Sequence, residues 1–546
     1  MKYNFHMFVG HFKRTFLELS LVYICHTTRT CHFNYSEMKT VVYFLFFNWC
    51  VVFSNSAKVM ILTQNLNSHV LDTIKLGLLL ADESHEVYLI LPSTAKIPDS
   101  IKERNITVLT AMVNRTVTEV HIEERSKQLL DYVMSKSTIG KMITYMQILT
   151  TGDPGWDAMC SSLLSDAKIR DYINATNYDV VIVDVLIMKC YVQMMGHRNI
   201  PIIVYGILVY EWSYHIPSLP SFVPMLLTNF DDRMSFFQRF QNSLLYALCQ
   251  ILFTSVFPNP PVSITEISQK YSLYFALNDI SSEYPRPTMP NVIFVGDAIP
   301  EPGNPLPRDL AEFVDGAKHG VIYVSFGTYL RRLPTILTDK LCATFKQIPQ
   351  RVIWKQEDLT LCGIDPDKLL ISKWLPQNDL LSHHNVKLFV THCGKNSLLE
   401  STYHSTPVIG FPIAIDQPLN AKLIANRGLG YVMDLGDFSA DELTSKIADL
   451  LANETILYNV RRASFVMRNK TDTPSKRISF WVEHMATYGG SHLRTNSELN
   501  IFQFYCLDVV LFIMFLILLI IISNIFCIRL IFRCLKRRLV SKSKTD

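Results

Sequence analysis

The chain has 546 residues, of which 49% are apolar and 18% are charged, and its formal net charge is +4. This length allows two or more domains with full-sized cores, and the high apolar share favours a membrane component. Because the net charge is small and no basic stripe with interleaved aromatic residues occurs in the body of the chain, nucleic acid is not expected as a partner.

The N-terminal region has the layout of a secretory signal whose start is displaced inward. A Met-Lys pair at 38–39 precedes an apolar run, and the small residues at 54–56 offer a cleavage site. We therefore predict a signal peptide over residues 38–56 and an N-terminal extension over residues 1–37, with translation starting at Met38. An uncleaved N-terminal anchor is the alternative.

Residues 57–284 alternate short apolar runs with helical patterns. The segments Lys58–Leu62, HEVYLIL, YDVVIVDVL and IPIIVYG are rich in Val and Ile, as buried strands are. Buried strands separated by helices predict a parallel sheet with helices on both faces, which would form a first domain.

A proline-rich segment divides the chain. Seven prolines fall between residues 285 and 307, and proline is excluded from helix interiors and central strands, so we predict a linker there. The alternation then restarts over residues 308–500, with GVIYVSFG, RVIWK, LLISKW, VKLFVTH and TPVIGFP as strands. The predicted fold class is therefore α/β, with two doubly wound, Rossmann-like domains facing a cleft. Ligands of such sheets bind beyond the carboxyl ends of the strands.

The C-terminal region predicts a membrane anchor. Residues 509–528 contain no charge, and we predict a transmembrane helix over 507–528. The tail over 529–546 is basic, which places it in the cytosol and the domains in the lumen. The tail also resembles a Lys-x-Lys-x-x retrieval signal, so we expect a single-pass type I protein of the endoplasmic reticulum membrane.

Five sequons permit glycosylation, at Asn105, Asn114, Asn174, Asn453 and Asn469. Six of the twelve cysteines lie between residues 57 and 505, and their spacing indicates neither a metal site nor a disulfide pairing.

Polar residues gather behind two strands of the second domain. His392 and Gly394 directly follow VKLFV, and Asn396-Ser397 would open the next helix, whose N-terminus can bind a diphosphate. Glu400, one turn later, can accept hydrogen bonds from ribose hydroxyls.

Further receptors for a nucleotide sugar flank this turn. Asp416-Gln417, after the following strand, suit sugar hydroxyls, while Trp374 offers a flat face for a base and Gln377 follows three residues later. Each of these residues alone is as compatible with a cap, a turn or a core position. Their combination predicts a pocket for a nucleotide sugar.

The combination resembles the signature of the animal membrane-bound UDP-glycosyltransferases, the group that includes the glucuronosyltransferases. The match runs from Trp374 through His392 to Asp416-Gln417, and it extends to RPTMPNVIFVGD, HGVIYVSFGT and WVEHM. Three residues depart from the usual pattern, namely Cys393, Thr402 and Asp297. Ser325 matches a family position near the diphosphate.

The resemblance implies a GT-B fold. It assigns acceptor binding to residues 57–284 and UDP-sugar binding to residues 308–500. It implies UDP-sugar as the donor substrate and a small lipophilic molecule as the acceptor, with no cofactor and no metal.

Transfer to a hydroxyl requires a base, and histidine suits this role near neutral pH. His69 follows the first strand and matches the family's catalytic position. Asp184 ends a later strand at its carboxyl end and would orient the histidine, whereas Asp179 starts the same strand about 16 Å away. Direct displacement by an activated hydroxyl inverts the anomeric centre.

Several alternatives stay open at this point. The enzyme could act on one narrow steroid or membrane-lipid acceptor, or the chain could be a silent UDP-sugar-binding relative that partners active enzymes. A receptor with a lectin-like ectodomain would not call for the predicted pocket. Glucose and glucuronic acid are not distinguished as donor sugars, because no cation, Lys395 included, can be placed beside a sugar carboxylate. Homo- or hetero-oligomers are possible by analogy with relatives.

Overall fold

The computed structural model describes residues 56–113, 115–135, 154–195, 197–207, 218–225, 228–255, 271–358, 362–493, 501–504 and 506–542. The predicted N-terminal extension and all but the last residue of the predicted signal peptide lie outside these ranges. So do the last four residues of the tail and the sequon at Asn114. From Ala57 onward the chain forms one compact unit, which is the part considered below.

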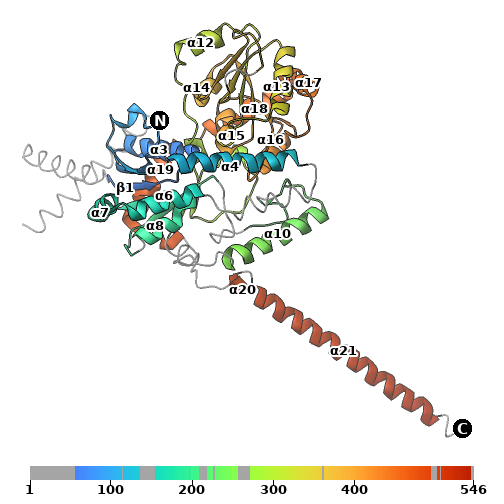
Figure 1. The fold of residues 1–546 in the computed structure, drawn as a ribbon. Coiled ribbons are helices and arrows are strands. Elements are labelled where there is room, and N and C mark those ends of the chain that lie inside the picture. The colour runs from blue at the N-terminus through green and yellow to red at the C-terminus, as the bar shows by residue number, and fades with distance from the viewer. Residues whose placement is uncertain are drawn as a thin grey trace, which may run out of the picture. The chain divides into compact units, whose positions relative to one another are not determined.

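The first domain is built on a seven-stranded parallel sheet in the order β3-β2-β1-β4-β5-β6-β7. Figure 1 labels its first strand, β1, beside the helices of this domain. Its strands are β1 (Lys58–Leu62), β2 (Glu86–Pro92), β3 (Ile106–Ala111), β4 (Val180–Asp184), β5 (Ile202–Gly206), β6 (Tyr271–Ala276) and β7 (Val292–Phe294). Every neighbouring pair runs parallel. The order reverses between β1 and β4, which is where ligands of doubly wound sheets bind.

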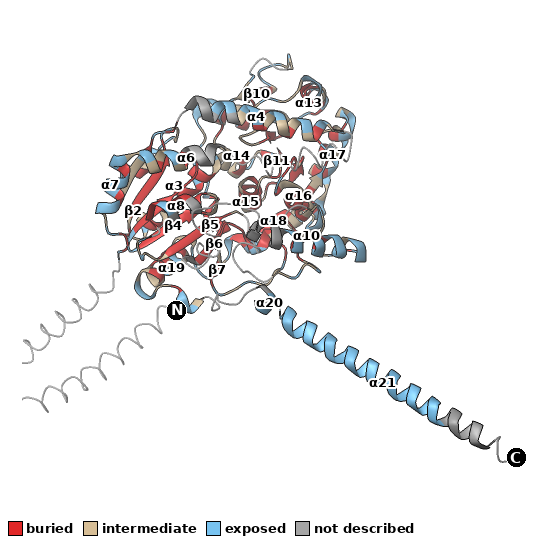
Figure 2. Cartoon of the chain, turned by 60° about the horizontal axis from the view of Figure 1, so that its bottom comes forward, coloured by how far each residue is buried: buried red, intermediate tan, exposed pale blue. Residues whose placement is uncertain are grey.

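The second domain contains a six-stranded parallel sheet in the order β10-β9-β8-β11-β12-β13. Its strands are β8 (Val321–Ser325), β9 (Arg351–Lys355), β10 (Leu369–Ser372), β11 (Val386–Thr391), β12 (Val408–Gly410) and β13 (Gly430–Val432). Its central strands are almost entirely buried, with Lys387 of β11 as the exposed position, because helices cover both faces (Figure 2). The predicted pair of Rossmann-like α/β domains is confirmed.

Helices connect these strands. In the first domain they are α3 (Asn67–Asp82), α4 (Arg115–Met134), α6 (Pro154–Ser165), α7 (Ala167–Ala175), α8 (Met188–Met195) and α10 (Phe236–Ser255). In the second they are α12 (Arg308–Asp315), α13 (Thr335–Gln347), α14 (Gln377–Ser382), α15 (Lys395–Tyr403), α16 (Gln417–Asn426), α17 (Ala440–Ala452) and α18 (Glu454–Arg468). The C-terminal segment adds α19 (Pro474–Tyr488), α20 (Ile501–Phe504) and α21 (Leu507–Lys542). Short 3-10 turns are η1 (Asp99–Ile101), η2 (Val185–Ile187), η3 (Ile280–Ser282), η4 (Gly296–Ala298) and η5 (Ser491–Leu493).

Local sequence explains where several helices begin. Asp166 caps α7 by accepting from two backbone N–H groups, and Ser439 caps α17 through the N–H of Glu442. At α19, Thr473 accepts from the N–H of Lys476, and Pro474 occupies the first helical position, where no N–H is needed.

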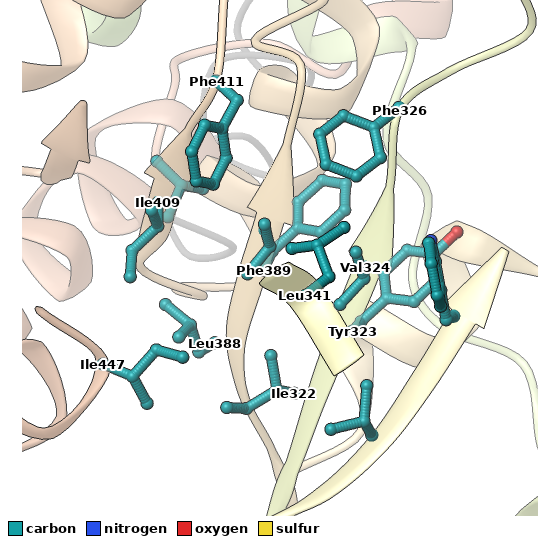
Figure 3. Close-up of a cluster of buried hydrophobic side chains, with 14 of the residues drawn as sticks. Ile322, Tyr323, Val324, Phe326, Leu341, Leu388, Phe389, Ile409, Phe411 and Ile447 are labelled. Carbon is teal, nitrogen blue, oxygen red and sulfur yellow. The ribbon is translucent and has the colours of Figure 1, made fainter. Parts of the chain in front are cut away.

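The core of the second domain positions the ends of β8 and β11. Tyr323 on β8 stacks on Phe389 on β11, with ring centroids 4.9 Å apart (Figure 3). Burial of such large side chains contributes roughly 1.5–3 kcal/mol each. The two strands are in register up to the pair Ser325 and Thr391, so the donor-site residues that follow both strands emerge at one edge of the sheet.

Two helices pack on the domain to which they do not belong by sequence. Leu129 and Val133 of α4 lie in the core of the second domain. Conversely, Ile478 and Val482 of α19 lie in the core of the first domain. The range 308–500 predicted for the second domain therefore contains a helix that completes the first, and the predicted linker contains β7, a strand of the first sheet.

An ion-pair cluster ties this returning segment to the first domain. Asp297 in η4 is buried and contacts Lys470 Nζ at 2.8 Å and Arg477 Nη1 at 2.8 Å. Lys470 also pairs with buried Asp279. Asp297, one of the three departures from the family pattern, thus has a structural explanation.

Two disulfides and one membrane-compatible helix complete the described chain. Cys160 is bonded to Cys190 and Cys342 to Cys362, pairings that spacing did not reveal. Within α21, Leu507–Cys534 is long and apolar enough to cross a membrane, and its most apolar 18-residue stretch has a mean hydropathy of 3.1. Its apolar side chains are exposed along the helix (Figure 2).

Candidate active site

The first part of the site is a buried histidine–carboxylate pair at the carboxyl edge of the first sheet. His69 lies in the first turn of α3, directly after β1, and Asp184 is the last residue of the neighbouring strand β4. Nδ1 of His69 lies 2.6 Å from Oδ2 of Asp184, and both side chains are buried. The structure therefore brings together the two residues predicted as the catalytic pair.

The pair is held in place from both sides. Oδ1 of Asp184 accepts from the backbone N–H of Leu186 at 2.9 Å, where β4 passes into η2. Thr73 Oγ1 donates to the carbonyl of His69 at 2.9 Å, which anchors the first turn of α3. Asp179 instead accepts from the N–H of Lys58 at the opposite edge of the sheet, so it takes no part in the pair.

The electrostatics favour a histidine that accepts a proton. Burial by itself lowers the pKa of His69, but the charge and hydrogen bond of Asp184 outweigh burial, and the pKa is raised above 6.5. When Nδ1 carries its proton toward Asp184, Nε2 is left as the basic atom.

The second part of the site is the turn between β11 and α15. Gly394 precedes the helix, and the first intrahelical bond runs from Leu398 N to the Gly394 carbonyl. The N–H groups of residues 395–397 are therefore not used by the helix, as expected at a helix N-terminus. A Cβ atom at Gly394 would lie 2.5 Å from Nε2 of His392, so the close approach predicted for this glycine is present.

His392 is held neutral beside this turn. Burial, and then the charge of Lys355, lower the pKa of His392 to about 4. Its Nδ1 is buried and has no hydrogen-bond partner among the described residues. A neutral imidazole with one uncommitted nitrogen is suited to receive a polar group of a ligand.

Three predicted donor-site residues contact one another. Gln377 Nε2 donates to Ser397 Oγ at 3.1 Å and to Glu400 Oε2 at 2.7 Å. The hydroxyl of Tyr323 donates to Gln377 Oε1 at 3.2 Å. Burial raises the pKa of Glu400, which Lys75 of the first domain opposes from 3.8 Å.

Asp416 and Gln417 follow the neighbouring strand β12. Asp416 Oδ2 accepts from Asn420 Nδ2 at 2.7 Å, and the same amide donates to the carbonyl of Cys393 at 3.1 Å. Asn420, which sequence reasoning missed, thus links the loop that carries Asp416 to the turn between β11 and α15. Gln417 Oε1 accepts from the N–H groups of Ile413 and Ala414, which leaves its Nε2 for a ligand.

Ser325 and Trp374 lie at the margins of this arrangement. Ser325 is buried at the end of β8, where its Oγ accepts from Gly327 N at 3.4 Å, so it also caps the strand end. The side chain of Trp374 is 61% exposed, and Lys96 of the first domain lies 5.8 Å from its ring centroid. An exposed ring face is consistent with the predicted stacking on a base.

Asn396 has an unexpected partner. Its Nδ2 donates to both carboxylate oxygens of Asp72 on α3, at 2.8 and 3.0 Å, so the donor turn is bonded to the first domain. Sequence reasoning missed Asp72. The available signal was its position three residues after His69, which puts both on one face of a helix with a buried stripe.

The fold defines a class of protein. Two doubly wound parallel sheets in one chain, with polar residues from both domains in contact, are the architecture of the GT-B fold. The structure is similar to LpCGTa in complex with UDP, with a TM-score of 0.51 and 16% identity over 78% of this chain and 98% of that one. It is also similar to Phytolacca americana UGT2 complexed with UDP-2fluoro-glucose and pterostilbene, with a TM-score of 0.52 and 16% identity over 79% and 99% of the two chains.

The family model described as UDP-glucoronosyl and UDP-glucosyl transferase matches residues 57–544, so the chain belongs to this family. Mouse UDP-glucuronosyltransferase 1A7 is 28% identical over 460 residues, or 80% of this chain and 85% of the relative. UDP-glycosyltransferase UGT4 of Dactylopius coccus is 31% identical over 407 residues, or 69% and 78% of the two chains. The protein is accordingly an enzyme that transfers a sugar from a UDP-sugar.

Proposed function

We propose that this enzyme transfers the sugar to a hydroxyl group of a small lipophilic acceptor, with inversion at the anomeric carbon. His69 is the base and Asp184 orients it. The observation that carries the proposal is the buried contact of 2.6 Å between His69 Nδ1 and Asp184 Oδ2. A histidine held in this tautomer directs Nε2 to a substrate hydroxyl, as in the histidine–aspartate part of a hydrolase triad.

The chemical step is a single displacement. The acceptor hydroxyl gives its proton to Nε2 of His69 while its oxygen forms a bond to the anomeric carbon. The bond from that carbon to the diphosphate oxygen breaks, and UDP leaves with the electron pair. Asp184 stabilises the imidazolium that forms, so an α-linked donor yields a β-glycoside.

The second domain holds the donor in this proposal. The N–H groups at the start of α15, together with His392, stabilise the charge that develops on the leaving diphosphate. Gln377 and Glu400 bind the nucleoside, Trp374 stacks on the base, and Asp416-Gln417 bind sugar hydroxyls. UDP-sugar is the donor substrate, and the proposal uses no cofactor.

The proposed location is the endoplasmic reticulum membrane, with both domains in the lumen. Helix α21 supplies an anchor followed by basic residues. The disulfides Cys160–Cys190 and Cys342–Cys362 support an oxidising compartment. Sensitivity of the glycans to endoglycosidase, with only the C-terminal tail accessible to protease in sealed microsomes, is the expected result. Protease digestion of the domains in sealed microsomes would contradict this orientation.

The activity is tested with the full chain expressed in microsomes. Labelled UDP-glucose and UDP-glucuronic acid are supplied with a panel of phenolic and steroidal acceptors. The variants are His69→Ala and, as a control, His319→Ala, which changes an exposed histidine on a turn. We expect transfer by the wild type and the control, and its loss in His69→Ala. Equal activity of the two variants would refute the assignment of the base.

A further inference from the structure

The contact between Asp72 and Asn396 is not used by the mechanism above. The carboxylate of Asp72 is 1% exposed, and both of its oxygens accept from Nδ2 of Asn396. Asp72 belongs to α3 of the first domain, and Asn396 is the second residue of α15 in the second domain. A buried carboxylate of the first domain therefore accepts the hydrogen bonds of an amide group that belongs to the proposed ligand site of the second domain.

Asp72 lies between the base and the donor turn. It follows His69 by three residues, so both side chains leave the same face of α3. Asp72 and Asp416 both raise the pKa of His69, so a carboxylate from each domain contributes to the charge around the proposed base. The transferred sugar must lie here, because its anomeric carbon is bound to the diphosphate on one side and attacked on the other.

Donor binding leaves Asp72 without its partner. If the diphosphate takes the amide N–H groups of Asn396, both carboxylate oxygens lose their hydrogen-bond donor. A buried carboxylate without donors is strongly unfavourable, so the bound donor substrate has to supply replacements. Hydroxyl groups of a hexose are donors, whereas a sugar carboxylate is not.

Two lysines among the described residues that influence these carboxylates also bond to other groups. Lys395, whose charge lowers the pKa of Asp416, contacts Glu283 Oε2 at 3.3 Å and the carbonyl of Ser282. Lys75, whose charge lowers the pKa of Asp72, lies 3.8 Å from Glu400 and donates a hydrogen bond to the carbonyl of Ile299. Burial raises the pKa of Asp72 to about 6, and His69, Asn396 and Lys75 oppose this rise only in part.

We propose that Asp72 is a specificity-determining residue, whose carboxylate accepts hydrogen bonds from hydroxyls of the transferred sugar and selects an uncharged hexose over a uronic acid. This inference rests on the proposed function and deepens it by naming the donor class. Like charges close together in a buried site exclude each other, so the carboxylate of a uronic acid is rejected there.

The test compares the full-length wild type with Asp72→Asn in microsomes. The control is Asp82→Asn, on the same helix but in a surface ion pair with Arg104. The measured quantity is kcat/KM for UDP-glucose, for UDP-glucuronic acid and for UDP-glucose lacking one hydroxyl at a time. We expect the wild type and the control to prefer UDP-glucose. In Asp72→Asn the preference over UDP-glucuronic acid falls roughly 10- to 100-fold, the range for a hydrogen bond to a charged group.

The deoxy donors identify the hydroxyl that Asp72 binds. At least one deoxy donor is expected to lose more activity in the wild type than in Asp72→Asn, because only the wild type has the charged acceptor. A wild type that prefers UDP-glucuronic acid would overturn the proposal, and this requires no variant to fold. So would a uniform loss for all donors in Asp72→Asn, since that is the signature of a merely structural role.

Binding keeps this test separate from the proposed chemistry. Equilibrium competition of the two UDP-sugars against labelled UDP measures donor preference without turnover. A preference for UDP-glucose that weakens in Asp72→Asn, in the absence of any transfer, would refute the proposed acceptor chemistry and retain the specificity of the site. Equal affinity of the wild type for both donors would refute the role of Asp72.

Discussion

The base and the donor site are assembled in different ways. The proposed base and its carboxylate partner lie inside one domain: His69 is in the first turn of α3, after β1, and Asp184 is the last residue of the adjacent strand β4. The donor site combines a cluster within the second domain, around Gln377, with contacts that Asp72 and Lys75 supply from the first.

This difference separates what sheet geometry dictates from what domain packing dictates. The carboxyl ends of parallel strands lie at one edge of the sheet. Residues that end or follow neighbouring strands are therefore close together, independently of how the rest of the chain folds. Contacts between domains depend on how two folded surfaces meet. The predictions below test the two kinds of contact separately, beginning with the largest expected effect.

Replacing the base is expected to have the largest consequence. His69→Ala removes the proton acceptor, and we expect transfer to fall by roughly 10²- to 10⁴-fold at saturating donor. Labelled product formed per unit time measures the loss. Binding of UDP should be unchanged, because the donor site lies mainly in the second domain, and weakened UDP binding of similar size would show that the two sites are not separable.

Asp184→Asn tests the orientation of the base. The expected loss is about 100-fold or more, since an amide disfavours the productive tautomer of His69. Because Asp184 is what raises the pKa of His69 above 6.5, the pH below which kcat/KM declines should also move down in the variant. Asp179→Asn, at the far end of the same strand, is the control. If kcat/KM of Asp184→Asn declined below the same pH as in the wild type, the assignment would be contradicted.

A contact between the first domain and the returning C-terminal segment is expected to matter for stability rather than rate. Asp297→Ala removes the buried carboxylate that Lys470 and Arg477 share. Lys470 keeps Asp279 and Arg477 keeps Asp472, so the expected cost is at most the roughly 3–5 kcal/mol of breaking a buried ion pair. Asp472→Ala removes a more exposed partner of Arg477 and should cost about 1 kcal/mol or less. Thermal unfolding in detergent micelles compares the two variants, and equal midpoints would argue against the cluster.

The smallest predicted effect concerns the diphosphate turn. Cys393 has a φ of +64°, a conformation that favours glycine, and its Sγ fills the space beside Gly410. Cys393→Gly relieves the backbone but removes the packing, so we expect a net change within about 1 kcal/mol. Cys393→Ala loses packing without that relief and should unfold at a lower temperature than Cys393→Gly. The reverse order would show that the backbone carries no strain here.

Much of this arrangement was predictable from the sequence. Both sheets follow from buried runs of Val and Ile, and strand-end position was sufficient to prefer Asp184 over Asp179. Gln377, Ser397 and Glu400 were expected to share a pocket, and Gln377 donates a hydrogen bond to each of the other two.

Other features could not be read from local patterns. In the sequence, Asp72 is an ordinary acidic residue within an amphipathic helix. Only the packing of the two domains reveals that it is buried against Asn396. The packing of α19 on the first domain was not predicted for the same reason, because an apolar helix face does not specify which core it covers. The disulfides required three-dimensional proximity of cysteines up to 30 residues apart.

The configuration of the product tests the central claim most directly. That claim is a single displacement by an acceptor hydroxyl that His69 deprotonates. The measurement is the NMR coupling constant of the anomeric proton in the glycoside made by wild-type enzyme from an α-linked UDP-sugar. The account predicts a β-glycoside. An α-glycoside would require two displacements or front-face attack, and would contradict the role assigned to His69 and Asp184.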